Sequence, residues 1–151
     1  MEIIAHTMQL VTNNLPISPL DLRNYQDKDY KAYKQVYENC FSEMRQALKL
    51  FPVNCCNSRE KLKEKAADIF ILETDGELIG SVAIYGSEID DLIVARKYQG
   101  KGHGQRLLRF AIARMQRLGI CPIVLHVADW NKKAMRLYEK NGFVVVKTEI
   151  V

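Results

Sequence analysis

The sequence predicts a mixed α/β fold, in which an antiparallel meander of three strands is followed by a strand–helix–strand unit with two parallel strands. Apolar residues recur at helical spacing between residues 30 and 48, but from residue 68 they form short runs bounded by turn residues. A second amphipathic segment, residues 102–118, lies between two such runs. The length of 151 residues, with 48% apolar and 26% charged residues, predicts one globular domain over residues 1–151.

The first part of the chain is predicted to contain one short strand and two helices. Residues 17–24 alternate loosely and could form a first strand. Asp27 or Asp29 can cap the helix that follows, which is one bent helix or two short ones and must end before Pro52. A capping sequence at its start predicts a further short helix over 57–67.

The meander occupies the middle of the chain. Residues 68–73 form an apolar run, and residues 77–85 form the return strand. The Asp-Gly pair at 75–76 between them is a strong hairpin signal. After another turn, residues 88–95 are predicted to be the third strand of this antiparallel set.

The last part alternates helices and strands. The helix over 102–118 ends at Gly119, and residues 121–128 contain a buried strand. Asn131 is a plausible N-cap for the next helix, and the last strand is predicted over 143–148.

Composition excludes several classes of protein. The excess of 22 Lys and Arg over 18 Asp and Glu is too small to indicate a nucleic-acid partner. No apolar run approaches the ~20 residues of a membrane helix, and the N-terminus lacks the basic start and apolar centre of a signal peptide. We therefore expect a reduced, cytoplasmic protein with no membrane partner. The adjacent Cys55 and Cys56 lack partners at zinc spacing, so no metal is expected and their role stays open.

Three glycines fall within five residues, at Gly100, Gly102 and Gly104, between a predicted strand and a predicted helix. Glycine lets the backbone approach a ligand closely, and the free N–H groups of a helix N-terminus favour an anion such as phosphate. A dinucleotide fingerprint would need Gly or Ala where Gln105 or Leu107 stands, and no P-loop sequence is present. Both nucleotide motifs are thus excluded.

Two motifs in order carry a family resemblance. Residues 99–104 read Q-G-K-G-H-G and fit Q/R-x-x-G-x-G/A, while residues 131–143 fit N-x-x-A-x-x-x-Y-x-x-x-G-F. Together they resemble the GNAT superfamily of acyl-CoA-dependent N-acetyltransferases over about residues 88–146. The resemblance implies a GNAT-like fold, with a β-α-β-α-β unit whose central strands splay apart. It also implies acceptor-side helices over about 25–67 and an acetyl-CoA-binding core over about 68–148.

The resemblance implies where acetyl-CoA, the expected co-substrate, would bind. Its pyrophosphate would lie on backbone amides of the glycine loop, and its pantetheine arm would pair with the strand before that loop. A bulge in this strand would free an N–H to polarise the thioester carbonyl. The implied coenzyme-binding residues are Leu92, Ile93, Val94, Gln99, Gly100, Lys101, Gly102, His103, Gly104, Gln105 and Asn131.

The chemistry requires an acid and a base. A primary amine has a pKa near ~10.4 and must lose a proton before it attacks the thioester. Tyr138 matches the family's usual general acid, which protonates the leaving thiolate. Glu88 is the leading base and His126 the second, and a further possibility is that neither serves. Asp90 should share the strand face of Glu88, whereas Asp91 should point the other way.

These motifs predict an N-acetyltransferase that moves an acetyl group from acetyl-CoA to a primary amine by direct attack. The acceptor is a small-molecule or peptide amine whose identity the sequence does not reveal. One alternative is a non-catalytic acyl-CoA-binding regulatory module, and another is a nucleic-acid-binding domain that uses the arginines of helix 102–118. A homodimer is also predicted if the last strand forms a sheet edge.

Overall fold

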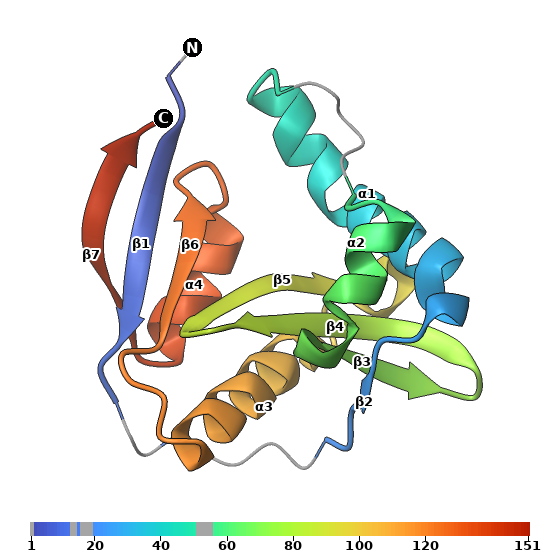
Figure 1. Ribbon diagram of the computed structural model, residues 1–151. Coiled ribbons are helices and arrows are strands. Elements are labelled where there is room, and N and C mark those ends of the chain that lie inside the picture. The colour runs from blue at the N-terminus through green and yellow to red at the C-terminus, as the bar shows by residue number, and fades with distance from the viewer. Residues whose placement is uncertain (1, 13–14, 16–19, 51–55) are drawn as a thin grey trace.

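The computed structural model describes residues 2–12, 15, 20–50 and 56–151, and its strands form one mixed sheet (Figure 1). In the described part of the chain the strand order is β2-β3-β4-β5-β6-β1-β7. The strands are β1 (Ile4–Leu10), β2 (Arg23–Asn24), β3 (Ile69–Thr74), β4 (Glu77–Tyr85), β5 (Glu88–Val94), β6 (Val124–Ala128) and β7 (Phe143–Ile150). The helices are α1 (Tyr30–Ala47), α2 (Arg59–Glu64), α3 (His103–Arg117) and α4 (Lys132–Lys140), with short 3-10 turns η1 (Asp27–Asp29), η2 (Ala66–Asp68) and η3 (Arg96–Tyr98).

The predicted meander is confirmed. Strands β3, β4 and β5 pair antiparallel in sequence order. The turn between β3 and β4 has positive φ at both Asp75 (52°) and Gly76 (76°). This backbone twist matches that of the flanking strands, which explains why an Asp-Gly pair lies there.

Two layers of helices cover this part of the sheet. Helices α1 and α2 lie on one side of β3–β5 and α3 lies on the other (Figure 1). Each side has its own apolar core. On the α3 side the buried helix residues are Leu107, Leu108, Ala111, Ile112 and Met115, and on the α1 side they are Tyr33 and Val36.

The parallel pair predicted for the second half of the chain is β5 with β6, and it is very short. Only Glu88 with Val124 and Ile89 with Leu125 are in register. Beyond these two pairs the strands have no further paired residues in the part of the chain that the structure describes, so the sheet opens between them.

Strand β5 also contains the bulge that the family resemblance implied. Its register with β4 shifts so that Val82 alone stands opposite both Asp91 and Leu92. Asp91 takes a φ of +47°, in the left-handed region that L-residues other than Asn and Asp rarely adopt. The bulge lies where β5 parts from β6, so it changes the direction of side chains at the opening.

The N-terminal strand β1 was not predicted. It lies between β6 and β7 and pairs antiparallel with both. The sequence instead placed a first strand over 17–24; the structure assigns only Arg23 and Asn24 of that range to a strand, and residues 17–19 lie outside the described part. The hydrophobic pattern of β1 is weak because only Met8 in it is fully buried.

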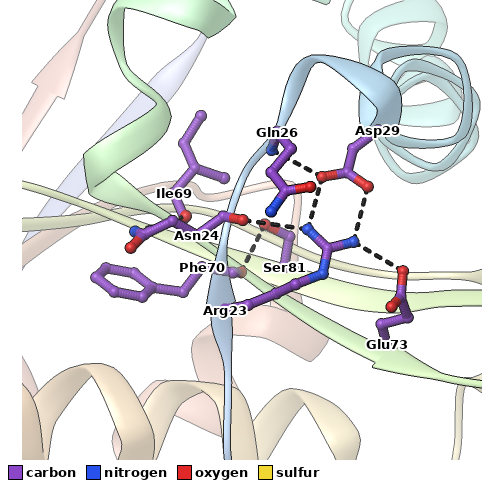
Figure 2. Close-up of polar contacts among 8 residues, drawn as sticks. All are labelled: Arg23, Asn24, Gln26, Asp29, Ile69, Phe70, Glu73 and Ser81. Atoms are coloured by element: carbon purple, nitrogen blue, oxygen red, sulfur yellow. Dashed lines mark hydrogen bonds and ion pairs between the residues drawn. The ribbon is translucent and has the colours of Figure 1, made fainter.

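The start of α1 also differs from the prediction of a simple cap by Asp27 or Asp29. The Asp29 side chain makes no cap bond to α1. Its carboxylate instead accepts two bonds of 2.8 Å from the Arg23 guanidinium and one of 2.8 Å from the Gln26 amide, while Arg23 also donates to Glu73 at 2.7 Å (Figure 2). This network joins the start of α1 to β2 and β3.

The remaining helix boundaries follow local signals. Helix α1 is a single helix that ends at Ala47, and Pro52 lies outside the described residues. Ser58 caps α2 by accepting from the Lys61 amide at 3.3 Å, and Asn131 caps α4 by accepting from the Ala134 amide at 3.2 Å. None of the described helices combines the length and the apolar character needed to cross a membrane.

Candidate active site

A cleft of about 620 Å³ opens where β5 and β6 part. Its walls come from α1, the bulged half of β5, the glycine loop, the end of β6 and α4. Among the residues expected to bind the coenzyme or to act in catalysis, eleven line this cleft: Leu92, Val94, Gln99, Gly100, Gly102, His103, Gly104, Gln105, His126, Asn131 and Tyr138.

Three of the expected residues do not line it. Ile93 is fully buried in the core beneath α1. Lys101 is in the loop, but it contributes a carbonyl that accepts a 2.8 Å bond from the Arg106 guanidinium. Glu88 lies at the start of β5, where the strands are still paired, and it points toward His126.

The glycine loop contains two residues with positive φ at the start of α3. Gly100 and Gly102 have φ of +77° and +83°, and Gly102 is the N-cap residue of the 15-residue helix α3. A helix N-terminus of this length offers free amides and a positive dipole end to an anion. Burial, and then the charges of Arg106 and Lys101, lower the pKa of His103, so its ring is neutral at pH 7.

The end of β5 is tied to α1 and the loop rather than to β6. The Val94 carbonyl accepts a 3.0 Å bond from the Gln99 side-chain amide and a 3.3 Å contact from the Cys40 thiol. Gln99, the first residue of the loop motif, therefore fixes the loop against the strand that precedes it.

Helix α4 brings Tyr138 to the cleft from the α3 side of the sheet. Its ring packs edge-on against Phe143 with centroids 6.2 Å apart. Burial, with a smaller contribution from the charge of Asp90, raises the pKa of Tyr138 to about 12. The phenol is therefore protonated throughout the neutral range and can donate a proton.

The two predicted bases, Glu88 and His126, are bonded to each other. Glu88 Oε1 lies 2.9 Å from His126 Nε2, and His126 Nδ1 lies 3.1 Å from the Thr7 hydroxyl on β1. Burial and then Asp90 raise the pKa of Glu88, while His126 opposes the shift. The residues that the sequence offered as alternatives thus form one pair on adjacent strands.

Two neighbouring carboxylates, Asp90 and Asp91, line the cleft as well. Asp90 is exposed, and its Oδ1 accepts from the Asp91 amide at 2.7 Å. Asp91 is half-buried and receives a hydrogen bond from the Tyr37 hydroxyl of α1. Burial, then repulsion from Asp90, raises the pKa of Asp91 to about 7, although Tyr37 and Lys65 oppose the shift.

The sequence did not predict Asp90 or Asp91 as site residues. Simple alternation of side chains along the strand placed Asp91 on the face opposite to Glu88. A usable signal was present. Two consecutive acids in an otherwise apolar strand, Ile89 to Val94, violate alternation, and a bulge is the feature that resolves such a violation.

Among the described cysteines, Cys40, Cys56 and Cys121 are in no disulfide, and Cys55 lies outside the described residues. Within the described ranges, no three His, Cys, Asp or Glu side chains group as they would around a metal ion.

A mixed sheet that opens between two parallel strands, beside a glycine loop at a helix N-terminus, defines the fold class of the acyl-CoA N-acetyltransferases. Residues 29–143 match the sequence profile of the family described as Acetyltransferase (GNAT) family. The chain therefore belongs to the GNAT family.

Individual relatives with similar sequences are also named as acetyltransferases. A mycothiol acetyltransferase of Propionibacterium freudenreichii subsp. shermanii is 34% identical over 80 residues, which are 53% of this chain and 23% of that protein. The spermidine N(1)-acetyltransferase of Vibrio cholerae is 41% identical over 69 residues, 45% of this chain and 40% of that protein. The chain thus spans less than half the length of these relatives.

A solved structure confirms the fold. The PaiA N-acetyltransferase of Thermoplasma acidophilum, crystallised in complex with coenzyme A, superposes with a TM-score of 0.70 at 23% identity. The match covers 85% of this chain and 92% of that one.

Proposed function

We propose that this chain is an N-acetyltransferase that transfers an acetyl group from acetyl-CoA to a primary amine by direct attack. The observation that carries the proposal is the one cleft where the glycine loop, the partly buried and protonated Tyr138 and the carboxylates of Asp90 and Asp91 meet. The relatives named for acetyl transfer support the same reaction. We further propose that residues 1–151 act as one domain, with residues 25–67 on the acceptor side and 68–148 on the coenzyme side.

The proposed coenzyme contacts follow the loop. The amides from Gly100 to Gln105 would hold the pyrophosphate, and the backbone of Leu92, Ile93 and Val94 would pair with pantetheine. The positive φ values of the loop glycines fit a backbone that lies directly against a ligand. Asn131 would reach the coenzyme with the side-chain amide that does not cap α4.

In the proposed reaction the neutral amine attacks the thioester carbonyl, the C–N bond forms and the C–S bond breaks. Tyr138 supplies the proton for the departing thiolate. Glu88 is the first candidate for the base and His126 the second. Because they are hydrogen-bonded, we propose that they act as one unit if either takes part.

The acceptor proposed here is a small-molecule or peptide amine in the cytoplasm, with no nucleic acid or membrane partner. Asp90 and Asp91 give the cleft an acidic character where it opens beside α1, which favours a cationic amine. The name of the Vibrio cholerae relative makes a polyamine one natural member of the first panel.

The decisive experiment measures thiol release from acetyl-CoA with a panel of amines: spermidine, an aminoglycoside, free amino acids, and peptides with a free N-terminus or lysine. We expect release with at least one class of amine. Tyr138→Phe should lower kcat by about 10²-fold or more, since an acid catalyst typically contributes 10²–10⁴-fold. It should leave the acetyl-CoA Kd within about twofold of wild type, as measured by calorimetry, because the variant keeps the ring.

Unchanged turnover in Tyr138→Phe would refute the acid assignment. Binding of acetyl-CoA without release for any amine would favour the non-catalytic acyl-CoA-binding module. Neither binding nor release would refute the coenzyme site itself.

We also propose a homodimer formed through β7. This strand is an edge of the sheet, and its side chains Val144, Val145, Val146 and Ile150 are exposed. An exposed apolar edge strand can pair with the same strand of a second copy.

A further inference from the structure

We propose that Asp91 is the general base that takes the proton from the acceptor's ammonium group. The inference rests on the proposed N-acetyltransferase function and identifies a residue that the family motifs in this sequence do not. It starts from the bulge in β5, which places a carboxylate in the cleft at the point where the sheet opens.

The backbone at Asp91 is held in an uncommon conformation. Its φ is +47°, and its amide is bonded at 2.7 Å to the Asp90 carboxylate. A non-glycine residue with such a φ persists only where the surrounding structure imposes it, and these positions cluster at functional sites. At Asp91 the result is a carboxylate that lines the cleft and also meets the Tyr37 hydroxyl.

The proposed acid and this carboxylate line the cleft from opposite sides of the sheet. Tyr138 packs against the core beneath α3. Asp91 interacts with Tyr33, Tyr37 and Tyr85, which belong to the core beneath α1. An acceptor that entered along α1 would thus meet Asp91, whereas the leaving thiolate would meet Tyr138.

The groups around Asp91 suit it to act as a base near neutral pH. From β5, Asp90 and Glu88 repel its negative charge, and from beside η2 the Lys65 ammonium attracts it. From α1 the Tyr37 hydroxyl donates to it, and the Asp91 charge lies near enough to Tyr33 and Tyr85 to raise their pKa values. The balance, with burial as the largest effect, is a pKa of about 7, whereas an ordinary Asp at ~3.9 is a weak base.

The proton balance is complete without a further reactant. Asp91 takes one proton from the ammonium, and the neutral amine attacks the thioester carbonyl to form the C–N bond. When the C–S bond breaks, the thiolate takes the proton of Tyr138. After the attack the nitrogen carries two protons, and it gives one of them to the tyrosine oxygen as the amide forms. Asp91 then releases its proton to solvent.

The test measures kcat/KM from pH 6 to 10 with the amine that gives the fastest thiol release in the panel. Asp91→Asn is nearly isosteric and tolerates positive φ, so it preserves the bulge. We expect kcat/KM to fall by about 10²–10⁴-fold at pH 7. The loss should shrink toward pH 10, because free amine then forms without a base. The matched control is Asp75→Asn, which makes the same change at a φ of +52° in the β3–β4 turn and should not alter the profile.

Two further variants should shift the pKa of Asp91 without removing its carboxylate. Tyr37→Phe deletes a hydrogen bond that lowers the pKa of Asp91, so the acid limb of the profile should shift to higher pH. Asp90→Asn deletes a repelling charge, so the limb should shift to lower pH. A residue with only a structural role would produce neither shift.

The inference is overturned if Asp91→Asn keeps more than a third of wild-type kcat/KM at pH 7, or if its loss is the same at pH 7 and pH 10. It is also overturned if Glu88→Gln, and not Asp91→Asn, shows the pH-dependent loss. Failure of the proposed acetyltransferase function would give a different result from failure of the Asp91 assignment. In that case the wild-type protein would release no thiol with any amine.

Discussion

Asp29 is buried and Asp91 is half-buried, yet the pKa values of their carboxyl groups move in opposite directions. Burial raises the pKa of a carboxyl group unless a positive charge compensates. At Asp29 the bonds from Arg23 and from the Gln26 amide overcome burial, so the pKa is lowered. At Asp91 the attraction of the Lys65 ammonium is outweighed by burial and by the charge of Asp90, so the pKa is raised. One residue is therefore suited to hold the fold and the other to exchange a proton.

The Asp29 network should make a measurable contribution to stability. Arg23→Met would leave a carboxylate that is 7% exposed without its cation, and we expect a loss of about 2–3 kcal/mol in urea unfolding at pH 7. The matched control is Arg59→Met. Arg59 pairs with Asp27 just as closely at 2.7 Å, but on the surface, and should change stability by less than about 1 kcal/mol. Equal losses in the two variants would contradict the assignment.

The same network sets the response to acid. The pKa values of Asp29 and Glu73 are lowered in the folded protein, so the stabilisation is present above the unfolded carboxyl pKa near ~4 and is lost as pH falls through the folded values. We expect the midpoint of thermal unfolding to fall more steeply below pH 4 in wild type than in Arg23→Met. Parallel pH dependences would show that Arg23 does not set these pKa values.

Asp91 should have the reverse effect on stability. Its folded pKa of about 7 lies above the unfolded value, so stability falls as pH rises from about 4 to 7 and stays lower above that. Asp91→Asn should match wild type at pH 4 and exceed it at pH 8.5, by roughly 1–3 kcal/mol. Thermal unfolding at the two pH values measures this, and a variant less stable than wild type at pH 8.5 would contradict it.

At the scale of elements, the glycine loop ties the start of α3 to the proposed coenzyme site. At Gly102, with a φ of +83°, an added Cβ would contact the Arg106 guanidinium at 3.5 Å. Gly102→Ala should be strained because of this φ, and it should also disturb the loop that lines the cleft. We expect acetyl-CoA affinity to fall by about tenfold or more in calorimetry, since a loss of ~1.4 kcal/mol of binding free energy is a factor of ten.

Gly76→Ala is the control for backbone strain alone. Its φ of +76° is similar, and an added Cβ would meet nothing within 4 Å. Both variants should lose stability, but only Gly102→Ala should lose affinity for acetyl-CoA. An equal loss of affinity would mean that instability, and not the loop, causes it.

Most elements could be predicted from the sequence because their signals are local. The β4 strand, the Asp-Gly turn and the Asn131 cap follow from residues within a few positions of each other. The β1 strand could not be predicted, because its position between β6 and β7 depends on pairing with segments at the other end of the chain.

The candidate site also contains features that local sequence predicts and features that depend on long-range packing. The loop and the α4 motif predict Tyr138 and the proposed coenzyme-binding residues, and most of these line the cleft. The pairing of Glu88 with His126 and the burial of Asp91 under Tyr37 arise from register and from helix packing. Neither can be read from spacing, since a one-residue shift in a strand reverses the direction of every side chain beyond it.

At the scale of the whole molecule, the sheet ends at β7. Four apolar side chains on that strand are exposed, and Val146 at 53% exposure lies near its middle. If β7 pairs with a second copy, Val146→Lys should place two like charges close together across the new pair and convert a dimer to a monomer. Sedimentation at micromolar concentrations measures this, and a wild-type monomer at ~100 µM would refute the dimer.

The placement of β1 has a consequence for how the protein is made. Strand β1 precedes every other described element in this sequence, yet it pairs only with β6 and β7, which follow all the other described strands. Until they emerge, the β3–β5 meander and its two helical layers can assemble, but β1 must wait with both of its edges unpaired. Completion of the sheet is thus a late event that depends on long-range pairing. A nascent chain stalled before residue 124 would contain the glycine loop and the β5 wall of the cleft but not its β6 wall.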